Sequence, residues 1–445
     1  MYFKDHLLNY KELYLIILSW PLLGFALPSL AVVVWSIISF VLILKLGDLT
    51  KVLIAFAYTL LFSDSYLNPL AFASSAKIGM ILILFIYVVT NLKEFKVFNN
   101  KIFIYFLPFL VLALFASFWS DQLLTSFQKS ISYGIIFFTA PLIFQKAYSD
   151  NKSFDQDLVA AYTIFLFIGL VTWILNPYDA TLAGRFRGLM GNPNGMGTLL
   201  TILGIFVYVL YQKGENLRNL DKKSWYIFLG LFIVNLYLCG SRTALLSVLM
   251  FLGFTRIRDF SNLGSLVIFI ALVASSNYIL ANLPFIVLSL GLEEYLRIET
   301  IAEGSGRFIA WNFAWEQIQN NFFFGGGFGF TEAIYKEYFH YLSQLGHQGN
   351  AHNSYLTLWL DTGLVGVLLF LLGILRSMFG TASKVPYAMA AMYTVIVSAN
   401  FESWLAASLN PFTILFIVSL TLMMKEEAPA NAENGAEIAL KNSNE

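Results

Sequence analysis

The sequence has little charge and almost no cysteine. Of its 445 residues, 12% are charged, whereas 58% are hydrophobic and 17% are aromatic. Soluble globular proteins carry about 25% charged residues, so this composition excludes an ordinary soluble domain and indicates a polytopic membrane protein. The single cysteine, Cys239, excludes an internal disulfide and has no companion ligands for a metal. The balanced net charge gives no indication of a polyanionic partner, and we expect no binding of nucleic acid.

Long apolar segments follow one another along most of the chain. Turn and charge signals divide them into about fourteen predicted transmembrane helices, which indicates an all-α polytopic integral membrane fold. The predicted spans are residues 12–27, 29–45, 51–63, 69–91, 101–119, 127–146, 157–176, 194–212, 224–239, 241–256, 262–281, 354–376, 385–400 and 411–424. They predict an N-terminal bundle (1–280), a long loop domain (281–353), C-terminal helices (354–424) and a tail (425–445) whose composition is typical of disorder.

The lysines and arginines segregate between alternate loops. Residues 1–11 are interpreted as a cytoplasmic stub and not as a cleaved signal peptide. Most basic residues then fall in loops on the cytoplasmic side, as the positive-inside rule requires, and the C-terminus is cytoplasmic too. The long loop lies on the outer face. Basic residues on that face oppose the rule and are therefore candidates for function: Lys129, Arg185, Arg187, Arg242, Arg297, Arg307 and Lys336.

The start of a helical pattern in the long loop carries a candidate anion site. Gly304-Ser305-Gly306-Arg307 precedes a segment in which Trp311 and Trp315 are four residues apart. This spacing predicts an interfacial helix with both indoles at the level of the lipid headgroups, capped by Ser305. Arg307 in its first turn opposes the helix dipole, which indicates an anion bound beside it.

The end of the loop carries a candidate proton acceptor. A histidine titrates near neutral pH, so His352 is a candidate general base, and Asn353 is expected to orient its ring or to cap the next helix. A cap without chemistry is the alternative interpretation. The acids that could replace His352 as the base are Glu332, Asp361 and Glu402. The spacing of the three loop histidines, His340, His347 and His352, matches no common metal site, so we predict no metal.

Two arginines flank an aromatic residue in the loop before the eighth predicted span. Arg185 and Arg187 precede Asn192-Pro193-Asn194, which is a turn signal, and we expect Asn194 to cap the following helix. Arginines beside a helix N-terminus are suited to phosphate, so a phosphate clamp is the favoured interpretation. Snorkelling of both arginines to lipid headgroups is the alternative.

Two further cations lie at membrane depth. Arg242 stands in the turn after Cys239, and Lys77 lies inside the fourth predicted span. A cation at this depth costs a few kcal/mol and usually faces a polar cavity or a ligand. A structural ion pair of Arg242 with Glu402 or Asp121 is the alternative. The glycine-rich residues 325–329 are followed by no Gly-Lys-Ser/Thr, so they predict close packing or ligand approach and no nucleotide cofactor.

Four segments in this order resemble the superfamily of O-antigen ligases, Wzy-type polymerases and related oligosaccharyltransferases. The segments are Trp119-Ser120-Asp121 with Ser126; Arg187-Gly188 with Gly191-Asn192-Pro193-Asn194; Ser241-Arg242-Thr243; and residues 304–307 with Trp311, residues 325–329, His352-Asn353, Tyr355-Leu356 and Gly363-Leu364-Val365-Gly366. Their order, spacing and outward topology together carry the resemblance, because each motif alone has little specificity.

The resemblance implies a glycosyltransferase of the bacterial inner membrane whose active site lies in the periplasmic loop. The implied donor is a glycan on undecaprenyl diphosphate, and the implied acceptor is lipid A-core or a lipid-linked glycan. The implied diphosphate ligands are Arg187 or Arg185, Arg242 and Arg307, with His352 as the base. The residues themselves add Lys77 as a further candidate diphosphate ligand and Asn192, Asn194, Asn353 and Glu402 as supporting residues. No cofactor is implied.

The chemistry of the outer face agrees with these roles. No ATP is present there, so a donor must arrive activated, and preplaced guanidinium groups would stabilise the leaving diphosphate. The family implies inversion at the anomeric carbon. Ligase and polymerase stay open, because the sequence does not indicate the acceptor or the oligomeric state. A flippase or other transporter is a second alternative, although no internal repeat is evident. A scaffolding protein would give no reason for outward arginines.

Overall fold

The described chain is almost entirely helical. The computed structural model describes residues 2–95, 100–213, 215–258, 261–275, 306–347, 349–382 and 387–424, with Val385 and a few single positions between 278 and 291. Within these residues the only strands are β1 (Thr181–Leu182) and β2 (Arg185–Phe186), which form a two-stranded antiparallel hairpin. The predicted tail, 425–445, lies outside the described residues.

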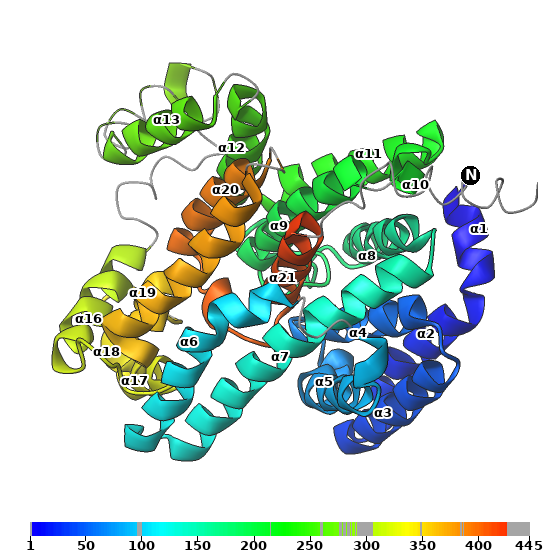
Figure 1. Cartoon of the computed structure of the whole chain (residues 1–445), viewed down its shortest axis with the longest axis horizontal. Coiled ribbons are helices and arrows are strands. Elements are labelled where there is room, and N and C mark those ends of the chain that lie inside the picture. Colours follow the sequence, from blue (N-terminus) through cyan, green and yellow to red (C-terminus); the bar gives the residue numbers. More distant parts are fainter. Residues whose placement is uncertain are drawn as a thin grey trace, which may run out of the picture.

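Along the chain, one group of helices precedes the hairpin and a second group follows it; Figure 1 labels the helices. Before it lie α1 (Tyr2–Asn9), α2 (Lys11–Ala26), α3 (Ser29–Lys45), α4 (Leu49–Ser63), η1 (Asn68–Leu70), α5 (Ala73–Thr90), η2 (Leu92–Glu94), α6 (Lys101–Ala116), η4 (Ser117–Trp119), α7 (Leu123–Asp150) and α8 (Phe154–Leu175). After it lie α9 (Pro193–Lys213), α10 (Glu215–Arg218), α11 (Lys222–Cys239), α12 (Arg242–Arg258), α13 (Asn262–Ala274), α16 (Arg307–Asn320), α17 (Phe330–Glu337), α18 (Phe339–Gln344), α19 (Ser354–Ala382), α20 (Ala388–Phe401), η7 (Trp404–Ala406) and α21 (Pro411–Met424).

Each predicted span contains a helix, but length divides these helices into two sets. Six helical segments are long and apolar enough to cross a membrane by length and composition: Asn68–Thr90, Lys101–Trp119, Leu123–Asp150, Phe154–Leu175, Pro193–Lys213 and Ser354–Ala382. Other predicted spans coincide with shorter apolar helices, such as α3 and α21. A mostly helical architecture with six helices able to cross a membrane is therefore confirmed for the described residues, whereas the crossing of the bilayer by all fourteen segments stays a prediction.

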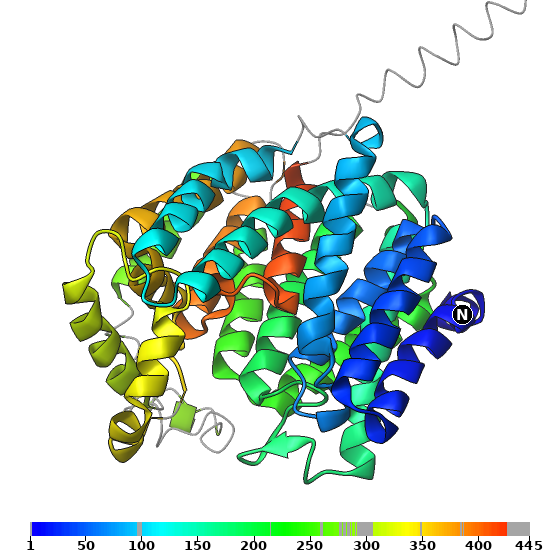
Figure 2. The same cartoon turned by 90° about the horizontal axis from the view of Figure 1, so that it is seen from below.

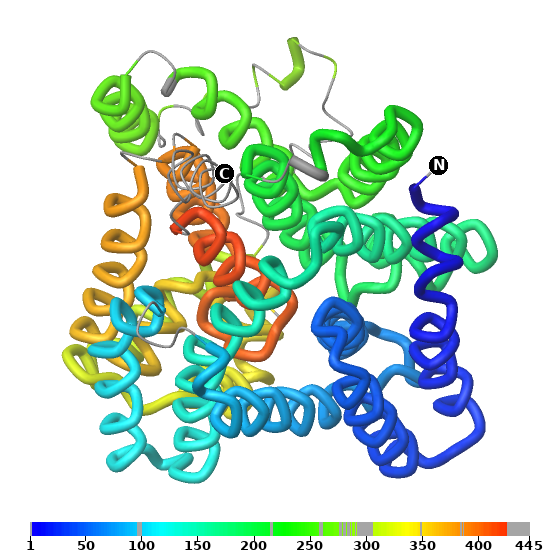
Figure 3. The backbone as a smooth tube through the Cα atoms, turned by 45° about the vertical axis from the view of Figure 1, so that its right-hand side comes forward, coloured from blue at the N-terminus to red at the C-terminus, as the bar shows by residue number. Residues whose placement is uncertain are grey.

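The centre of the bundle is helix α21, which every view shows surrounded by other helices (Figures 1 and 3). All residues from Pro411 to Met423 are buried, as expected for a helix that is apolar on every face. It packs against α9 and α7, and beside it α6 packs along α19. Helices at the margin, by contrast, expose large apolar side chains, among them Leu15, Leu22, Leu30 and Ile38. Such side chains are suited to contact with lipid tails.

Residues 2–9, inside the predicted cytoplasmic stub, form a docked helix. In α1, His6 is buried and its Nδ1 lies 2.9 Å from Oδ1 of Asp157 on α8. The hydroxyl groups of Tyr2 and Tyr10 also donate to the Asp157 carboxylate, at 2.5 and 2.8 Å. A carboxylate with this many donors is well compensated for burial, so it ties the N-terminal helix to the bundle.

Helices α16, α17 and α18 form a small separate core on one end of α19. Ala310, Phe313, Ile334 and Leu342 are buried in it. The predicted helix start at Arg307 is confirmed, with Gly306 as its N-cap; Ser305, the expected cap, lies outside the described residues. In Figure 2 these helices, drawn in yellow, and the β hairpin both lie toward the lower edge of the molecule.

The tryptophans of α16 make internal contacts that the sequence analysis did not anticipate. Trp311 donates its indole N–H to the carbonyl oxygen of Ala351 at 2.9 Å, so it does not offer that group to lipid headgroups. Trp315 packs edge-on against Trp359 of α19, with ring centroids 5.6 Å apart. Both rings therefore fasten α16 to the return of the loop and to α19.

The glycine-rich residues 325–329 dock into a break in α19. Gly363 has φ 69° and ψ −179°, which interrupts the helix, so that nearby backbone carbonyl groups can accept hydrogen bonds from another segment. The amides of Gly326 and Gly327 donate to the carbonyls of Leu360 and Asp361, at 2.9 and 2.8 Å. A Cβ at Gly363 would lie 2.2 Å from the backbone of Phe323, so only glycine fits. The predicted close packing of this segment is confirmed.

The carboxylate of Asp361 holds the start of α17 in this docked position. Its Oδ1 accepts hydrogen bonds from the amide and the hydroxyl of Thr331, at 2.9 and 2.7 Å, and its Oδ2 accepts one from the amide of Gly329 at 3.4 Å. The side chain is buried. Glu332 instead forms an ion pair with Lys129 of α7 at the exposed edge.

We expect Asp361→Ala to undock the loop helices. Loss of the carboxylate leaves the amides of Gly329 and Thr331 without an acceptor, while the Thr331 hydroxyl can still donate to the carbonyl of Thr357. This loss should lower the stability of the subdomain by about 3 kcal/mol. Limited proteolysis in detergent should then cut within residues 306–347 at lower protease concentrations, while the bundle stays intact. The matched control is Glu332→Ala, which removes an exposed ion pair and should change stability by less than about 1 kcal/mol. Equal protease resistance of both variants and the parent protein would contradict this account.

Candidate functional site

Three predicted residues meet at the end of α20. An Nη2 N–H of Arg307 donates to Oε1 of Glu402 at 2.7 Å, and Oε2 of the same carboxylate lies 3.5 Å from Nδ1 of His352. The side chains of Arg307 and Glu402 are only 17% and 15% exposed, whereas that of His352 is 34% exposed. We call this group the Glu402 cluster. Its pairs are poorly screened by water, and the imidazole is the member most open to a substrate.

Glu402 changes the interpretation of Arg307. The sequence placed a cation against the helix dipole and indicated a bound anion as compensation. In the structure Glu402 is an anion in that position, from a segment 95 residues away. The hydrogen bond to Glu402 uses one of the five N–H groups of Arg307. A second anion, such as a phosphate, could therefore share the same guanidinium group.

The backbone at His352 is in an unusual conformation. Its φ is 44°, a left-handed value that residues with a side chain seldom adopt. Its amide donates to Oδ1 of Asn350 at 2.9 Å, which helps to hold the turn. A Cβ on Gly349 would lie 3.1 Å from Nε2 of His352, so the glycine leaves space beside this nitrogen. Strained positions of this kind occur most often where the surrounding structure fixes a functional group.

Asn353 caps α19 and fastens the histidine turn to α20. Its Oδ1 accepts hydrogen bonds from the amides of Tyr355 and Leu356, at 2.9 and 3.1 Å, which confirms the expected cap. Its amide donates to Oγ of Ser403, and its Nδ2 donates to Oδ1 of Asn400, at 3.0 and 3.1 Å. The sequence analysis missed Ser403 and Asn400, because neither polar residue stands in a motif.

The two arginines of the β hairpin have different surroundings. Arg187 donates from Nε and Nη2 to the carbonyl of Asp179 and from Nη1 to the carbonyl of Gly191, and its guanidinium lies 3.7 Å from the ring centroid of Tyr66. Arg185 donates from Nη2 to Oδ1 of Asn194 at 2.6 Å and from Nε to the carbonyl of Cys239. Arg187 is thus committed to holding its own loop, whereas Arg185 reaches the turn before Arg242.

The cap of α9 differs from the prediction. Oδ1 of Asn192 accepts the amide of Gly195 at 2.7 Å, so the capping side chain is Asn192. Asn194, which was expected to cap, lies inside the helix and instead accepts from Arg185. The expectation failed because Pro193 takes the first helical position, where proline is favoured, and this moves the cap one residue before it.

Arg242 begins α12 at the same end of the bundle as Glu402. It is partly buried, and the side chain of Arg185 lies against the preceding Gly240. Helices α12 and α20 pack along each other, and Phe254 contacts Tyr393 with ring centroids 4.8 Å apart. Phe254 lies near the end of α12, whereas Tyr393 lies near the start of α20. The two helices can therefore pack along their lengths only if they run antiparallel. Arg242 and Glu402 therefore lie at one end.

Lys77 lies beside an acid that the sequence analysis missed. Its Nζ donates to Oγ of Ser63 at 3.2 Å, next to Asp64. The residue Asp64 is partly exposed, but its Oδ2 is buried and has no hydrogen-bond partner among the described residues. Burial raises the pKa of this carboxyl to about 6, and the charge of Lys77 lowers it in part. The carbonyl of Asp64 accepts the amide of Gly191, so it adjoins the arginine hairpin.

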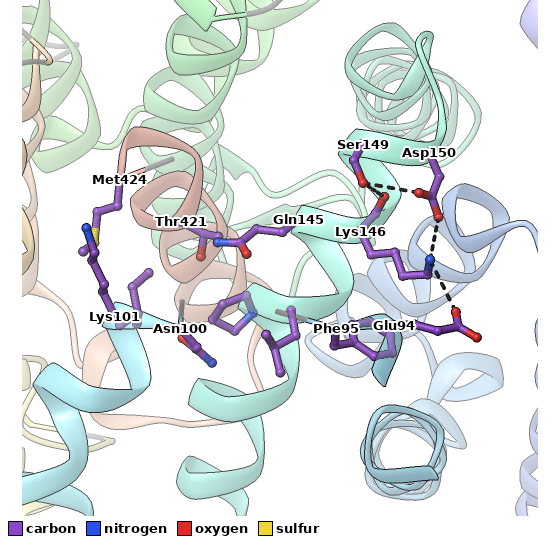
Figure 4. Close-up of a pocket in the computed structure, with 13 residues that line it drawn as sticks. Glu94, Phe95, Asn100, Lys101, Gln145, Lys146, Ser149, Asp150, Thr421 and Met424 are labelled. Carbon is purple, nitrogen blue, oxygen red and sulfur yellow. Dashed lines mark hydrogen bonds and ion pairs between the residues drawn. The ribbon is translucent and has the colours of Figure 1, made fainter. Parts of the chain in front are cut away.

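A cavity lies at the other end of the helices, away from all these groups (Figure 4). It measures about 470 Å³ and lies between α6, α7 and α21. Lys146 at its wall pairs with Glu94 and Asp150, at 3.4 and 3.3 Å. This end carries the lysines that predict the cytoplasmic face. The cavity therefore contributes nothing to the group of arginines that the sequence predicts on the outer face.

A family model described as O-antigen ligase matches residues 227–371. This segment contains Arg242, Arg307 and His352, whereas Glu402 lies beyond it. No curated protein matches the chain. The match confirms the resemblance to the superfamily of O-antigen ligases and Wzy-type polymerases. Over this segment, about a third of the chain, the protein is similar to the O-antigen ligase family, and its long apolar helices indicate a multi-pass membrane protein.

The raised pKa of Asp64 predicts a pH-dependent stability. A carboxyl that binds its proton more tightly in the folded state contributes stability below about pH 4, and this contribution is lost as the pH rises through about 6. Asp64→Asn does not ionise. Its melting temperature should therefore rise relative to that of the parent protein between pH 4 and pH 7, measured by thermal unfolding in detergent. The exposed Asp121→Asn is the control, and a pH-independent difference at Asp64 would refute the assignment.

Proposed function

We propose that the protein transfers a glycan from a polyprenyl diphosphate carrier to a hydroxyl acceptor on the outer face of the bacterial inner membrane. The observation that carries this proposal is the Glu402 cluster, which joins a guanidinium group and an imidazole through one carboxylate. Arg307 and His352 both lie in the segment that matches the O-antigen ligase family. The ligase-like form of the reaction, with lipid A-core as acceptor, is the specific proposal.

The proposed bond changes assign one task to each residue. The acceptor oxygen attacks the anomeric carbon, and the bond from that carbon to the diphosphate oxygen breaks with inversion. Negative charge develops on the leaving diphosphate, where Arg307 and Arg242 stabilise it. His352 takes the proton of the attacking hydroxyl. All reacting groups come from the protein and the two substrates, so neither ATP nor a cofactor enters the reaction.

The position of Glu402 favours Nε2 of His352 as the atom that takes the proton. Nδ1 faces the carboxylate at 3.5 Å, so a proton on Nδ1 is directed to Glu402. Nε2 is then the lone-pair nitrogen, beside the space that Gly349 leaves. The carboxylate also stabilises the imidazolium that forms, as an orienting acid does in a catalytic triad. The distance is long for a hydrogen bond, as is common before substrate binds.

The other acids considered as the base are engaged elsewhere. Both carboxylate oxygens of Asp361 accept hydrogen bonds from the docked loop, and Glu332 pairs with Lys129. Glu402 is held by Arg307 through a hydrogen-bonded ion pair at 2.7 Å, so this carboxylate already has a partner. His352 is more accessible than Asp361 and Glu402, although less so than the exposed Glu332, and it has one nitrogen directed away from the cluster. These contacts support His352 over the three carboxylates.

The assay that tests the function offers two acceptors to the purified protein. With a polyprenyl-diphosphate glycan as donor, transfer to lipid A-core would support the ligase, and a ladder on lipid-linked repeat units would support the alternative, a Wzy-type polymerase. His352→Ala should lower the rate by about 10²- to 10⁴-fold. Glu402→Gln should lower it less, because Nδ1 keeps an acceptor. Absence of transfer to both acceptors with intact donor binding would contradict the proposal and favour a transporter.

The arginines should separate into two kinds of variant. Arg242→Ala and Arg307→Ala should lose transfer with expression close to that of the parent, since their proposed task is to bind diphosphate. Arg307→Ala also leaves the Glu402 carboxylate without its cation, so its melting temperature should fall. Arg187→Ala should lower the melting temperature, because it leaves the carbonyls of Asp179 and Gly191 without their donor. Transfer rates and thermal unfolding measured on the same preparations distinguish these outcomes. A misfolded Arg307→Ala protein would show that this arginine is structural.

A further inference from the structure

A second histidine of the outer loop is buried directly behind the Glu402 cluster. His347 is 3% exposed, and its amide donates to the carbonyl of Leu342 at 2.9 Å. Its Nε2 lies 3.1 Å from the carbonyl oxygen of Asn350. A carbonyl oxygen only accepts hydrogen bonds, so Nε2 carries the hydrogen in this contact. The neutral ring therefore has a defined tautomer.

The other side of the His347 ring faces the segment that carries Arg307. A Cβ on Gly306 would lie 3.7 Å from Nδ1 of His347, so ring and backbone are in contact there. Gly306, with φ 75°, is the N-cap of α16, and Arg307 is the first residue of that helix. The histidine thus packs against the backbone that sets the direction of the Arg307 side chain.

The Asn350 side of the ring leads to His352. Asn350 accepts the Nε2–H of His347 on its carbonyl and the amide of His352 on its Oδ1. The two imidazole rings are nearly perpendicular, with centroids 6.0 Å apart. One buried ring therefore contacts both the segment that carries the guanidinium group and the turn that carries the proposed base.

We propose that His347 is a positioning residue for the transfer reaction: it fixes the Arg307 helix start against the His352 turn and so sets the distance between the two reacting groups. This inference rests on the proposed function, because it assigns His347 a task only if Arg307 and His352 act on one substrate pair. A misplacement of about 1 Å between catalytic groups can lower a rate by about 100-fold.

The charge state of His347 suits this position. Burial, first, and the neighbouring His352, second, lower its pKa, whereas hydrogen bonds with the backbone of Asn350 and Gly306 oppose the shift. The other titratable group packed against the ring is Tyr335, whose hydroxyl donates to the carbonyl of Ala310. The lowered pKa favours the uncharged form of the His347 ring. The ring then adds no further positive charge beside the imidazolium that forms on His352, which faces the Glu402 carboxylate that Arg307 also holds.

The test compares His347→Gln with His347→Leu. The glutamine amide can donate to Asn350 as the imidazole does, whereas leucine fills the space without a donor. We expect His347→Leu to lower kcat by about 10- to 100-fold with donor binding within about 2-fold of the parent, and His347→Gln to recover most of the rate. His340→Leu, at an exposed position of the same loop, is the matched control and should be fully active.

A double variant separates this inference from the proposed function. If His347 acts through His352, His347→Leu should lower the residual rate of His352→Ala by less than about 2-fold. A fully active His347→Leu protein would overturn the positioning role. Equal losses of rate in the leucine and glutamine variants, together with a lowered melting temperature, would overturn it too. In both cases His352→Ala would still test the proposed base. A His352→Ala protein with undiminished transfer would instead overturn the proposed base itself.

Discussion

The carboxylate of Asp361 and the break of α19 at Gly363 form the junction on which the outer part of the molecule depends. The glycine-rich segment enters the break and exchanges backbone hydrogen bonds with it, and Asp361 accepts three hydrogen bonds from the residues that follow. Trp119 adds an indole hydrogen bond to the carbonyl of Gly325. Helix α16 is then held against α19, and Arg307 reaches the end of α20. Without this junction, the arginine and its carboxylate partner would belong to separately moving parts.

The Glu402 cluster compensates the unfavourable position of Arg307 at the start of a helix, which the sequence shows without its compensating partner. A guanidinium group in the first turn of a helix and in a poorly hydrated place is unfavourable by itself. The carboxylate neutralises it and at the same time faces the imidazole. The resting site therefore carries little net charge, while the unused donors of Arg307 still allow it to bind a phosphate oxygen. Such a site is stable without a ligand and still attracts an anionic one.

Much of the fold could be predicted because its determinants are local. Apolar runs predicted the positions of the bundle helices, although not of α1, α10, α17 or α18. Helices α3 and α21 have the predicted bounds, whereas the sequence could not show that several of the bundle helices are short. The candidate arginines were also identified from local information, because the positive-inside rule predicts the orientation of each loop from the charges along the chain. The partners of these residues were not predictable. Arg307 and Glu402 are 95 positions apart, and no periodicity joins them.

The residues that sequence analysis missed share one property: their importance comes from what surrounds them. Asp64 resembles an ordinary helix-terminal acid until its buried oxygen and the nearby Lys77 are seen. His347 matched no motif, yet it contacts both halves of the proposed active site. Motifs select residues that touch substrate, whereas packing selects residues that hold them in place. The distance between Arg307 and His352 is therefore a property of the folded loop, and it is this distance, rather than the presence of either residue, that decides whether both can act on one substrate pair.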